Sequence, residues 1–479
     1  MLTPLLVALS LQVSPPTDPV FDAQTLRAEL DDLHTTLEAS QYDLYAITPR
    51  DVFDRHRALI HESLTEPLTL TETQILFQTY LALARIGHTR IDFPAAAWSE
   101  HVSEGGVMFP VSLRVHQGRV WIESDQSGLE TLSVGDEVLA LEGEPNAIWM
   151  PRLTRHISAD TPHLAHTLLE LYLPGLIWIE YPEARELSLT IRKTSGETVD
   201  VVVPLLDAHT HSQHAETTPD VISLDGFSQD FPTPDIAYLR PGPFYNTEPG
   251  GVVWDNTAYV ARIEAAYETL IQSGASHLIL DLRDNPGGDS SFSDPVIAPF
   301  ADEDFRFASR FTIRVSDATT ASNAARLAED PGATQSVSAQ FAALYANSQN
   351  GETVEFDIPF ATPHPTLRFE GEVYVLVNRY SFSNAVNAAA LIQDYGFGLI
   401  AGETTADMAT TYGAMETFTL PRTGIQVGYP KAHIIRPNGE TRVHPVTPDI
   451  PLDIPPLRGS QDVVLQQLID HIEDRHRQD

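Results

Sequence analysis

Ser383 lies in the stretch N-R-Y-S-F-S-N-A, directly before a segment with the periodicity of a buried helix. The spacing predicts a helix from about 383 to 395, whose buried positions are Ala385, Ala388, Ala389, Ile392 and Tyr395. The free N–H groups at such a helix start, the first being that of Asn384, can stabilise a developing oxyanion. Ser383 could therefore be the nucleophile of an acyl transfer, although serine is also a favoured N-cap residue.

A pair of glycines follows a second buried strand pattern. The residues L-I-L-D-L-R-D-N-P-G-G occupy 278–288, and paired glycines allow backbone N–H groups to approach a ligand closely. Strands of a parallel sheet end at the same edge, so this turn and the one after V-Y-V-L-V at 373–377 would meet. We predict that Gly287 and Gly288 supply the second amide of an oxyanion hole.

The surrounding elements suggest several domains in a chain of 479 residues. Leucines at helical spacing between 21 and 39, and a capping-box pattern at Thr71 and Gln74, predict a helical N-terminal domain. A β-rich domain with a turn at Gln117-Gly118 follows, and then strand–helix–strand units typical of a parallel α/β sheet. The predicted segments are a possible signal peptide or N-terminal arm (1–19), the helical domain (20–95), the β-rich domain (104–206), a linker (207–235), the catalytic α/β domain (236–456) and a C-terminal helix (457–479).

Composition excludes several classes of partner and site. Lys and Arg number 29 against 66 Asp and Glu, and the net charge of -37 argues against nucleic acid and peripheral membrane binding. The absence of cysteine excludes disulfides, thiolate metal sites and a cysteine nucleophile. No stretch is apolar enough to span a bilayer. The short apolar run at the N-terminus resembles a signal peptide and predicts a periplasmic or secreted protein; the alternative is a cytoplasmic protein with an N-terminal arm.

Other chemical motifs are weak. His209, His211 and His214 have a spacing that could hold a metal ion, but they stand in the predicted linker, where a solvated role is the stronger interpretation. The sequence contains no H-E-x-x-H, no phosphate-binding loop and no G-x-S-x-G. We therefore expect no metal and no cofactor.

Four motifs follow one another along the chain: D-L-R-D-N-P-G-G, V-L-V-N-R-Y-S-F-S-N-A with Q-D-Y-G, G-E-T-T, and V-T-P-D-I. Together they resemble the carboxyl-terminal processing (tail-specific) peptidases, a family that includes tricorn-core proteases and retinoid-binding repeats. The resemblance covers roughly residues 20–456. It implies an α/β protein with a ClpP/crotonase-like catalytic domain, an N-terminal helical domain and an inserted PDZ-like domain, the last matched by V-G-D-E-V-L-A-L-E-G. A carboxylate-binding loop of the GLGF type is not evident.

The resemblance also implies residue roles. Ser383 would be the nucleophile, and the amides of Gly287, Gly288 and Asn384 would form the oxyanion hole. The implied substrate is a peptide or protein.

The general base departs from the processing-peptidase pattern. Those enzymes use a lysine after G-E-x-T, where this chain has Met408, and a thioether cannot accept a proton. The tricorn-like branch instead uses a histidine and a glutamate. His88 in I-G-H-T-R matches the first, and Glu440 is the nearest carboxylate for the second, with Glu403 as a rival. Lys431 is a substitute base without motif support.

The predicted function is a serine endopeptidase that works through an acyl-enzyme and a Ser-His base pair. Imidazole suits this role because it titrates near neutrality, and a carboxylate can fix its tautomer. The main alternative is a catalytically silent ligand- or peptide-binding protein of the same fold. A third possibility is a hydrolase for a non-peptide acyl compound.

Overall fold

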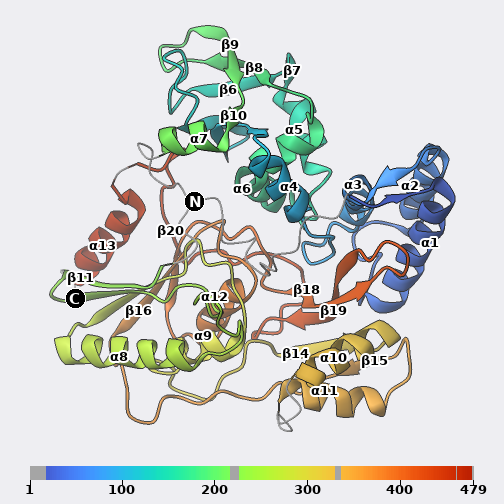
Figure 1. The fold of residues 1–479 in the computed structure, drawn as a ribbon. Coiled ribbons are helices and arrows are strands. Elements are labelled where there is room, and N and C mark those ends of the chain that lie inside the picture. Colours follow the sequence, from blue (N-terminus) through green and yellow to red (C-terminus); the bar gives the residue numbers. More distant parts are fainter. Residues whose placement is uncertain (1–17, 216–225, 330–335, 460, 477–479) are drawn as a thin grey trace. The chain divides into compact units, whose positions relative to one another are not determined.

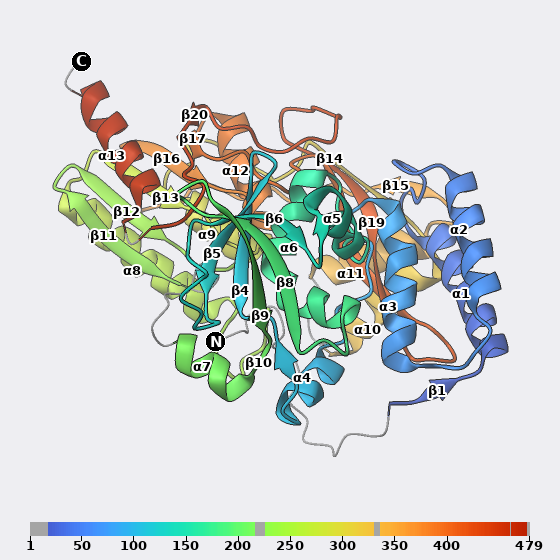
Figure 2. The same cartoon turned by 90° about the horizontal axis from the view of Figure 1, so that it is seen from above.

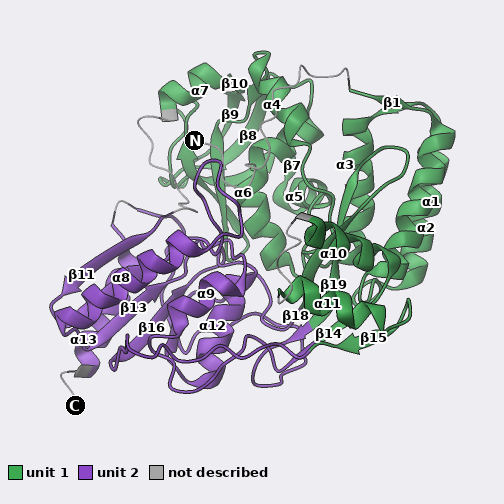
Figure 3. Cartoon of the chain, turned by 60° about the horizontal axis from the view of Figure 1, so that its bottom comes forward, with its two compact units in different colours: residues 1–221, 312–356, 412–433 green, residues 222–311, 357–411, 434–479 purple. Residues whose placement is uncertain are grey.

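The structure is a computed structural model, and it describes residues 18–215, 226–329, 336–459 and 461–476. The chain falls into two compact units, each built from three segments (Figure 3). Unit 1 comprises 1–221, 312–356 and 412–433; unit 2 comprises 222–311, 357–411 and 434–479. Residues 1–17 of the predicted signal peptide or N-terminal arm lie outside the described residues, and the predicted domain boundaries stay predictions.

Unit 2 is built on a mostly parallel sheet. In spatial order its strands are β11 (Ser228–Thr233), β12 (Ile236–Arg240), β13 (His277–Asp281), β16 (Glu372–Val377), β17 (Leu399–Gly402) and β20 (Ile450–Pro451). Only β11 is antiparallel to its neighbour. β13 and β16 are adjacent, with Leu280 opposite Val375, so their carboxyl ends meet at one edge as predicted.

Helices cover both faces of this sheet (Figures 1 and 2). α8 (Thr257–Ser273), α9 (Ser290–Ile297) and α12 (Asn384–Tyr395) pack on the face that carries Leu278, Leu280 and Val375. α13 (Val463–His476) packs on the opposite face, which carries Ile279 and Tyr374. The alternation of faces along β13 follows from the two-residue period of a strand, and burial on both faces explains its continuous apolar sequence.

The N-terminal part of unit 1 is helical, as predicted. Its elements are β1 (Val20–Phe21), α1 (Ala23–Ser40), α2 (Arg50–Ser63), β2 (Leu68–Thr69), α3 (Leu70–Leu81), the 3₁₀ turn η1 (Ala82–Ala84) and α4 (Ala95–Ser103). The prediction that Thr71 and Gln74 form the capping box of α3 is wrong. Thr69 and Glu72 form it, because each side chain bonds the backbone N–H of the other.

The β-rich part of unit 1 has a sheet with the strand order β4-β5-β6-β8-β9. Its elements are β3 (Val107–Met108), β4 (Val111–His116), β5 (Arg119–Asp125), β6 (Glu137–Leu141), β7 (Glu144–Pro145), α5 (Asn146–Thr154), α6 (Pro162–Glu180), β8 (Glu186–Arg192), β9 (Thr198–Pro204) and β10 (Leu206–Asp207). The predicted turn at Gln117-Gly118 is confirmed, with positive φ at both residues. A helix, α7 (Ala208–Ala215), occupies the start of the predicted linker.

A four-stranded sheet, most of which belongs to unit 1, completes the fold. Its order is β15 (Thr353–Glu355), β14 (Arg310–Arg314), β19 (Gln426–Ile435) and β18 (Thr411–Thr419), and the helices α10 (Asp317–Glu329) and α11 (Val337–Ala346) lie between β14 and β15 in sequence. The mixed α/β class is thus confirmed. Within the described ranges, no helix has the length and apolarity needed to cross a membrane.

Candidate active site

Ser383 stands in a sharp turn between β16 and α12. Its φ of 51° and ψ of -120° are unusual for a residue with a side chain, and such a conformation costs about 1–3 kcal/mol. Ser383 occupies the N-cap position, yet its side chain makes no capping hydrogen bond. The half-buried hydroxyl is therefore not used to cap α12, which was the structural alternative for this residue.

The turn before Ser383 is tied to the loop that follows β13. The side-chain oxygen of Asn378 accepts the N–H groups of Asp284, Tyr380 and Ser381, at 3.0–3.1 Å. The Ser381 hydroxyl donates to the carbonyl of Leu282 at 2.8 Å. These contacts make the two loops one rigid assembly, which the strain at Ser383 requires.

Gly287 lies directly against the strained serine. A Cβ added there would be 2.5 Å from the carbonyl oxygen of Phe382, 2.7 Å from the nitrogen of Asn384 and 2.9 Å from the Cβ of Ser383. Only glycine fits at this distance, and the φ of +87° favours glycine too. The predicted meeting of the glycine turn with the start of the helix is confirmed.

The two glycine amides differ in their availability. The N–H of Gly287 donates to the side chain of Asn285 at 2.9 Å. Its place in the oxyanion hole stays a prediction. Phe244 donates to the carbonyl of Gly287 and accepts from the N–H of Asp289, both at 2.9 Å. These two bonds flank Gly288, whose own N–H therefore points away from Phe244.

The structure adds Asp407, which the sequence analysis missed. Its carboxylate accepts the backbone N–H of Ser383 at 2.6 Å and that of Met408 at 2.8 Å. Burial raises the pKa of Asp407 to about 6, against the opposing effect of these two hydrogen bonds. The only sequence signal was an acidic residue in T-T-A-D-M, beside the position where a lysine would stand in the resembling family.

Comparison with known proteins gives this geometry a context. Residues 235–452 match the model of peptidase family S41. This part of the chain is an S41 peptidase domain. S41 peptidases are serine-type hydrolases, so the chain is an enzyme of that class. No curated protein sequence matches the chain.

Two similar solved structures extend the comparison to most of the chain. Mature CPAF has a TM-score of 0.60 and 15% identity, covering 90% of this chain and 93% of that one. CPAF complexed with lactacystin has a TM-score of 0.60 and 16% identity, with coverage of 90% and 94%. At this identity the similarity concerns the fold alone.

The residues that stand at, or could replace, the missing lysine and glutamate are engaged in other contacts or buried. Glu403 holds Arg379, with its carboxylate 2.7 and 2.9 Å from the guanidinium nitrogens. Met408 is buried, with 2% of its surface exposed, where the lysine of a Ser-Lys dyad would stand. Lys431, in unit 1, is 2.5 Å from Glu416 and lies over the ring of Phe341.

Glu440 is bound to groups other than Ser383. Its carboxylate accepts the N–H of Arg442 at 2.9 Å, a contact that lowers the pKa of Glu440, and its carbonyl accepts the hydroxyl of Thr410. No contact between Glu440 and Ser383 is found among the residues that the structure describes. The place of Glu440 in a triad stays a prediction.

His88 belongs to unit 1, in the turn after η1, and is 8% exposed. Burial, together with the charge of Arg90, lowers the pKa of His88 to about 4, against the effect of Asp160 and the backbone of Tyr412. The carboxylate that acts on His88 is thus Asp160, which also accepts the N–H of Gly87 at 2.8 Å. Nothing in the sequence pointed to Asp160. The pairing of His88 with Ser383 stays a prediction.

The histidine-rich stretch forms no metal site here. Around α7, the ring of His214 bonds the carbonyl of Gln126 and that of His209 contacts Gln213. In the described part of the chain, no group of three or more potential ligands is arranged to hold a metal ion.

Gly287→Ala should reduce kcat/KM by about 100-fold, because displacement of a nucleophile by about 1 Å costs that much. Gly396→Ala is the matched control, since its φ is +75° and no atom lies within 4 Å of an added Cβ. Both variants share the backbone cost of about 1–2 kcal/mol for a left-handed alanine. Peptide hydrolysis and melting temperature should be measured for both; equal activity of the two variants would contradict the importance of the close approach.

Proposed function

We propose that this chain cleaves peptide bonds through an acyl-enzyme formed on Ser383. The observation that carries the proposal is the strained serine at the start of α12 with an uncommitted hydroxyl. Strain of this kind persists only where surrounding contacts enforce it, and a nucleophile on a sharp strand-to-helix turn is a known arrangement for acyl transfer.

In the proposed reaction, the hydroxyl of Ser383 attacks the scissile carbonyl. The resulting oxyanion accepts the N–H of Asn384, the first of α12, and the N–H of Gly288, which points away from Phe244. Loss of the amine leaves an ester on Ser383, which water then hydrolyses. Donors fixed in advance stabilise the charge only as it develops, so they lower the barrier.

His88 is the proposed base, on the strength of the I-G-H-T-R motif. With its lowered pKa the imidazole is neutral near pH 7, so it can accept the serine proton and return it to the leaving amine. Asp160 is a stronger candidate than Glu440 for the carboxylate that stabilises the imidazolium, since its charge already acts on His88.

The finer architecture is also proposed. The strand order of unit 2 supports a ClpP/crotonase-like catalytic domain, and the β4–β9 sheet with α5 and α6 supports a PDZ-like domain that presents the peptide. Export to the periplasm or outside the cell is proposed from the N-terminal sequence alone.

Labelling with a fluorophosphonate probe tests the proposal directly. The native chain should be labelled covalently, and mass spectrometry of a digest should place the adduct on the peptide that contains Ser383. Heat-denatured protein is the control and should not react. Labelling of another residue, or none in the native chain, would contradict the proposal.

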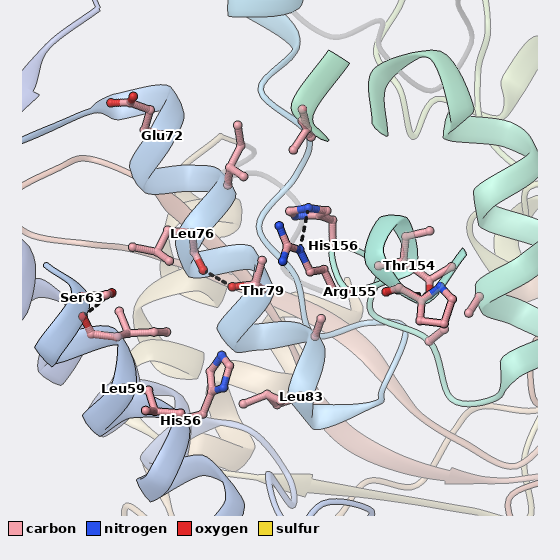
Figure 4. Close-up of a pocket in the computed structure, with 18 of the residues that line it drawn as sticks. His56, Leu59, Ser63, Glu72, Leu76, Thr79, Leu83, Thr154, Arg155 and His156 are labelled. Atoms are coloured by element: carbon pink, nitrogen blue, oxygen red, sulfur yellow. Dashed lines mark hydrogen bonds between the residues drawn. The ribbon is translucent and has the colours of Figure 1, made fainter. Parts of the chain in front are cut away.

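A large pocket favours a second candidate function. It has a volume of about 1530 Å³ and is lined only by unit 1 residues, largely apolar ones. In Figure 4, Leu59, Leu76 and Leu83 of the helical part lie on one side and Thr154, Arg155 and His156 on the other. Ligand pockets usually measure about 300–1,000 Å³, so an apolar ligand would fit. Binding of such a ligand would be a function beside hydrolysis, because Ser383 is not among the residues that line this pocket.

A further inference from the structure

Asp407 connects the nucleophile to the segment between β17 and β18. One carboxylate oxygen accepts the N–H of Ser383 at 2.6 Å, and the other accepts the N–H of Met408 at 2.8 Å. The Thr405 hydroxyl donates to the carbonyl of Asp407 at 2.9 Å and so fixes its backbone. The residue is 1% exposed, so the contact is shielded from solvent.

The contact is made to the backbone of Ser383 and not to its hydroxyl. Asp407 is therefore unsuited to take the serine proton as it stands. What the carboxylate fixes is the peptide plane between Phe382 and Ser383, which carries the N–H of Ser383. The preceding peptide plane is fixed as well, because the N–H of Phe382 donates to the carbonyl of Asn285 at 2.9 Å. The strained φ of Ser383 is a rotation relative to the plane that carries its N–H, so the direction of the hydroxyl depends on that plane.

Without this anchor, Ser383 has a favourable alternative. An ordinary N-cap serine adopts an extended backbone, and its side-chain oxygen accepts an N–H group from the first turn of the helix. The N-cap residues of α1, α3 and α6 do this, as the contacts of Asp22, Thr69 and Thr161 show. In that conformation the hydroxyl would be committed to the helix and turned from its present direction.

We propose that Asp407 is a positioning residue for peptide hydrolysis, which holds Ser383 out of the N-cap conformation. The inference rests on the proposed role of Ser383 as nucleophile. It assigns Asp407 no contact with the substrate. Because the N–H of Ser383 is bound by Asp407, the N–H of Asn384 is the helix amide left for the oxyanion.

Two substitutions of Asp407 test this inference. Asp407→Asn keeps the shape and one acceptor oxygen, and Asp407→Ala removes both acceptors. We expect kcat on a quenched peptide to fall about 10-fold and about 100-fold respectively, with KM unchanged, since misplacement of a reacting group costs about this much. The rate of fluorophosphonate labelling should fall in the same order.

Asp394→Asn is the matched control. Asp394 lies near the other end of α12, its side chain is 3% exposed, and it pairs with Arg436 at 2.7 Å. This variant should lower the melting temperature, because it weakens a buried ion pair. It should leave kcat and labelling within about two-fold, because Asp394 does not contact Ser383 or the turn that holds it in the part of the chain that the structure describes.

The outcomes separate the inference from the function on which it rests. Native protein that is labelled at Ser383, combined with an Asp407→Asn variant of unchanged kcat and labelling rate, would overturn the role of Asp407 alone. Unfolding of both Asp407 variants would show a role in the fold and would equally overturn it. If the native chain is not labelled at Ser383, the proposed function itself fails.

Discussion

Ser383→Ala is expected to reduce peptide hydrolysis by on the order of 10⁴-fold or more, because removal of the nucleophile eliminates the acyl-enzyme route. Probe labelling should vanish with it. The melting temperature should stay within about 2 °C of the native value, since the Ser383 side chain makes no capping hydrogen bond whose loss would cost stability. A slight decrease in melting temperature is expected, because alanine tolerates the strained backbone conformation at position 383 less well than serine. The measurements are a progress curve on a quenched peptide and a thermal unfolding scan.

Ser381→Ala provides the opposite pattern as a control. The Ser381 hydroxyl is fully buried, donates to Leu282 and accepts the N–H of Asn378 at 3.1 Å. Its removal leaves these groups without a partner and should cost about 1–3 kcal/mol of stability. Hydrolysis should fall far less than in Ser383→Ala, because the nucleophilic hydroxyl is still present although one support of its turn is lost. Activity that survives in Ser383→Ala and is lost in Ser381→Ala would place the chemistry elsewhere.

His88→Ala is expected to lower kcat/KM by about 100- to 10,000-fold, the usual contribution of a general base. The native enzyme should show an acid limb near pH 4, because the pKa of His88 is about 4 and only the neutral imidazole accepts a proton. This is lower than the value near neutrality that an ordinary histidine would give. In the variant both the rate and that limb should be absent. A variant that keeps the rate and the limb would contradict the assignment.

Asp160→Asn refines the same measurement. The negative charge of Asp160 raises the pKa of His88, so its removal should move the acid limb to lower pH and reduce kcat, because the imidazolium loses its partner. Glu440→Gln is the control, since Glu440 is turned to the N–H of Arg442. If Glu440→Gln moves the limb and Asp160→Asn does not, the triad of the resembling family holds and Asp160 is structural.

Much of unit 2 followed from local pattern. The strand before Gly287 and the helix after Ser383 were predictable because strand and helix periods impose different burial patterns on the sequence. Their meeting was predictable because parallel strands end at one edge of the sheet. The strained turn also has a local signature that was overlooked. Small residues, Ser381 and Ala385, stand two positions on either side of Ser383, where a sharp turn brings the chain close to itself.

The remaining features depend on contacts between distant segments. The N–H of Gly287 donates to the side chain of Asn285 because of the conformation of the loop. Two adjacent glycines do not specify that conformation. The carboxylates of Asp407 and Asp160 lie 24 and 72 positions from Ser383 and His88 (407 − 383 and 160 − 88), and no spacing rule connects them. The capping box of α3 was misplaced by two residues because T-L-T-E-T-Q offers two threonines with suitable partners.

The core of the helical part of unit 1 has a consequence for synthesis on the ribosome. The apolar faces of α1, α2 and α3 pack with Leu420, Ile425, Val427 and Tyr429, and Leu420 lies 339 positions after Leu81 (420 − 81). At about 5–20 residues per second, the ribosome needs roughly 20–70 s to deliver that partner. The apolar faces of the N-terminal helices therefore stay uncovered by this partner through most of translation. We expect a nascent chain of this kind to offer chaperones a long-lived binding site, and a product terminated before residue 420 to aggregate.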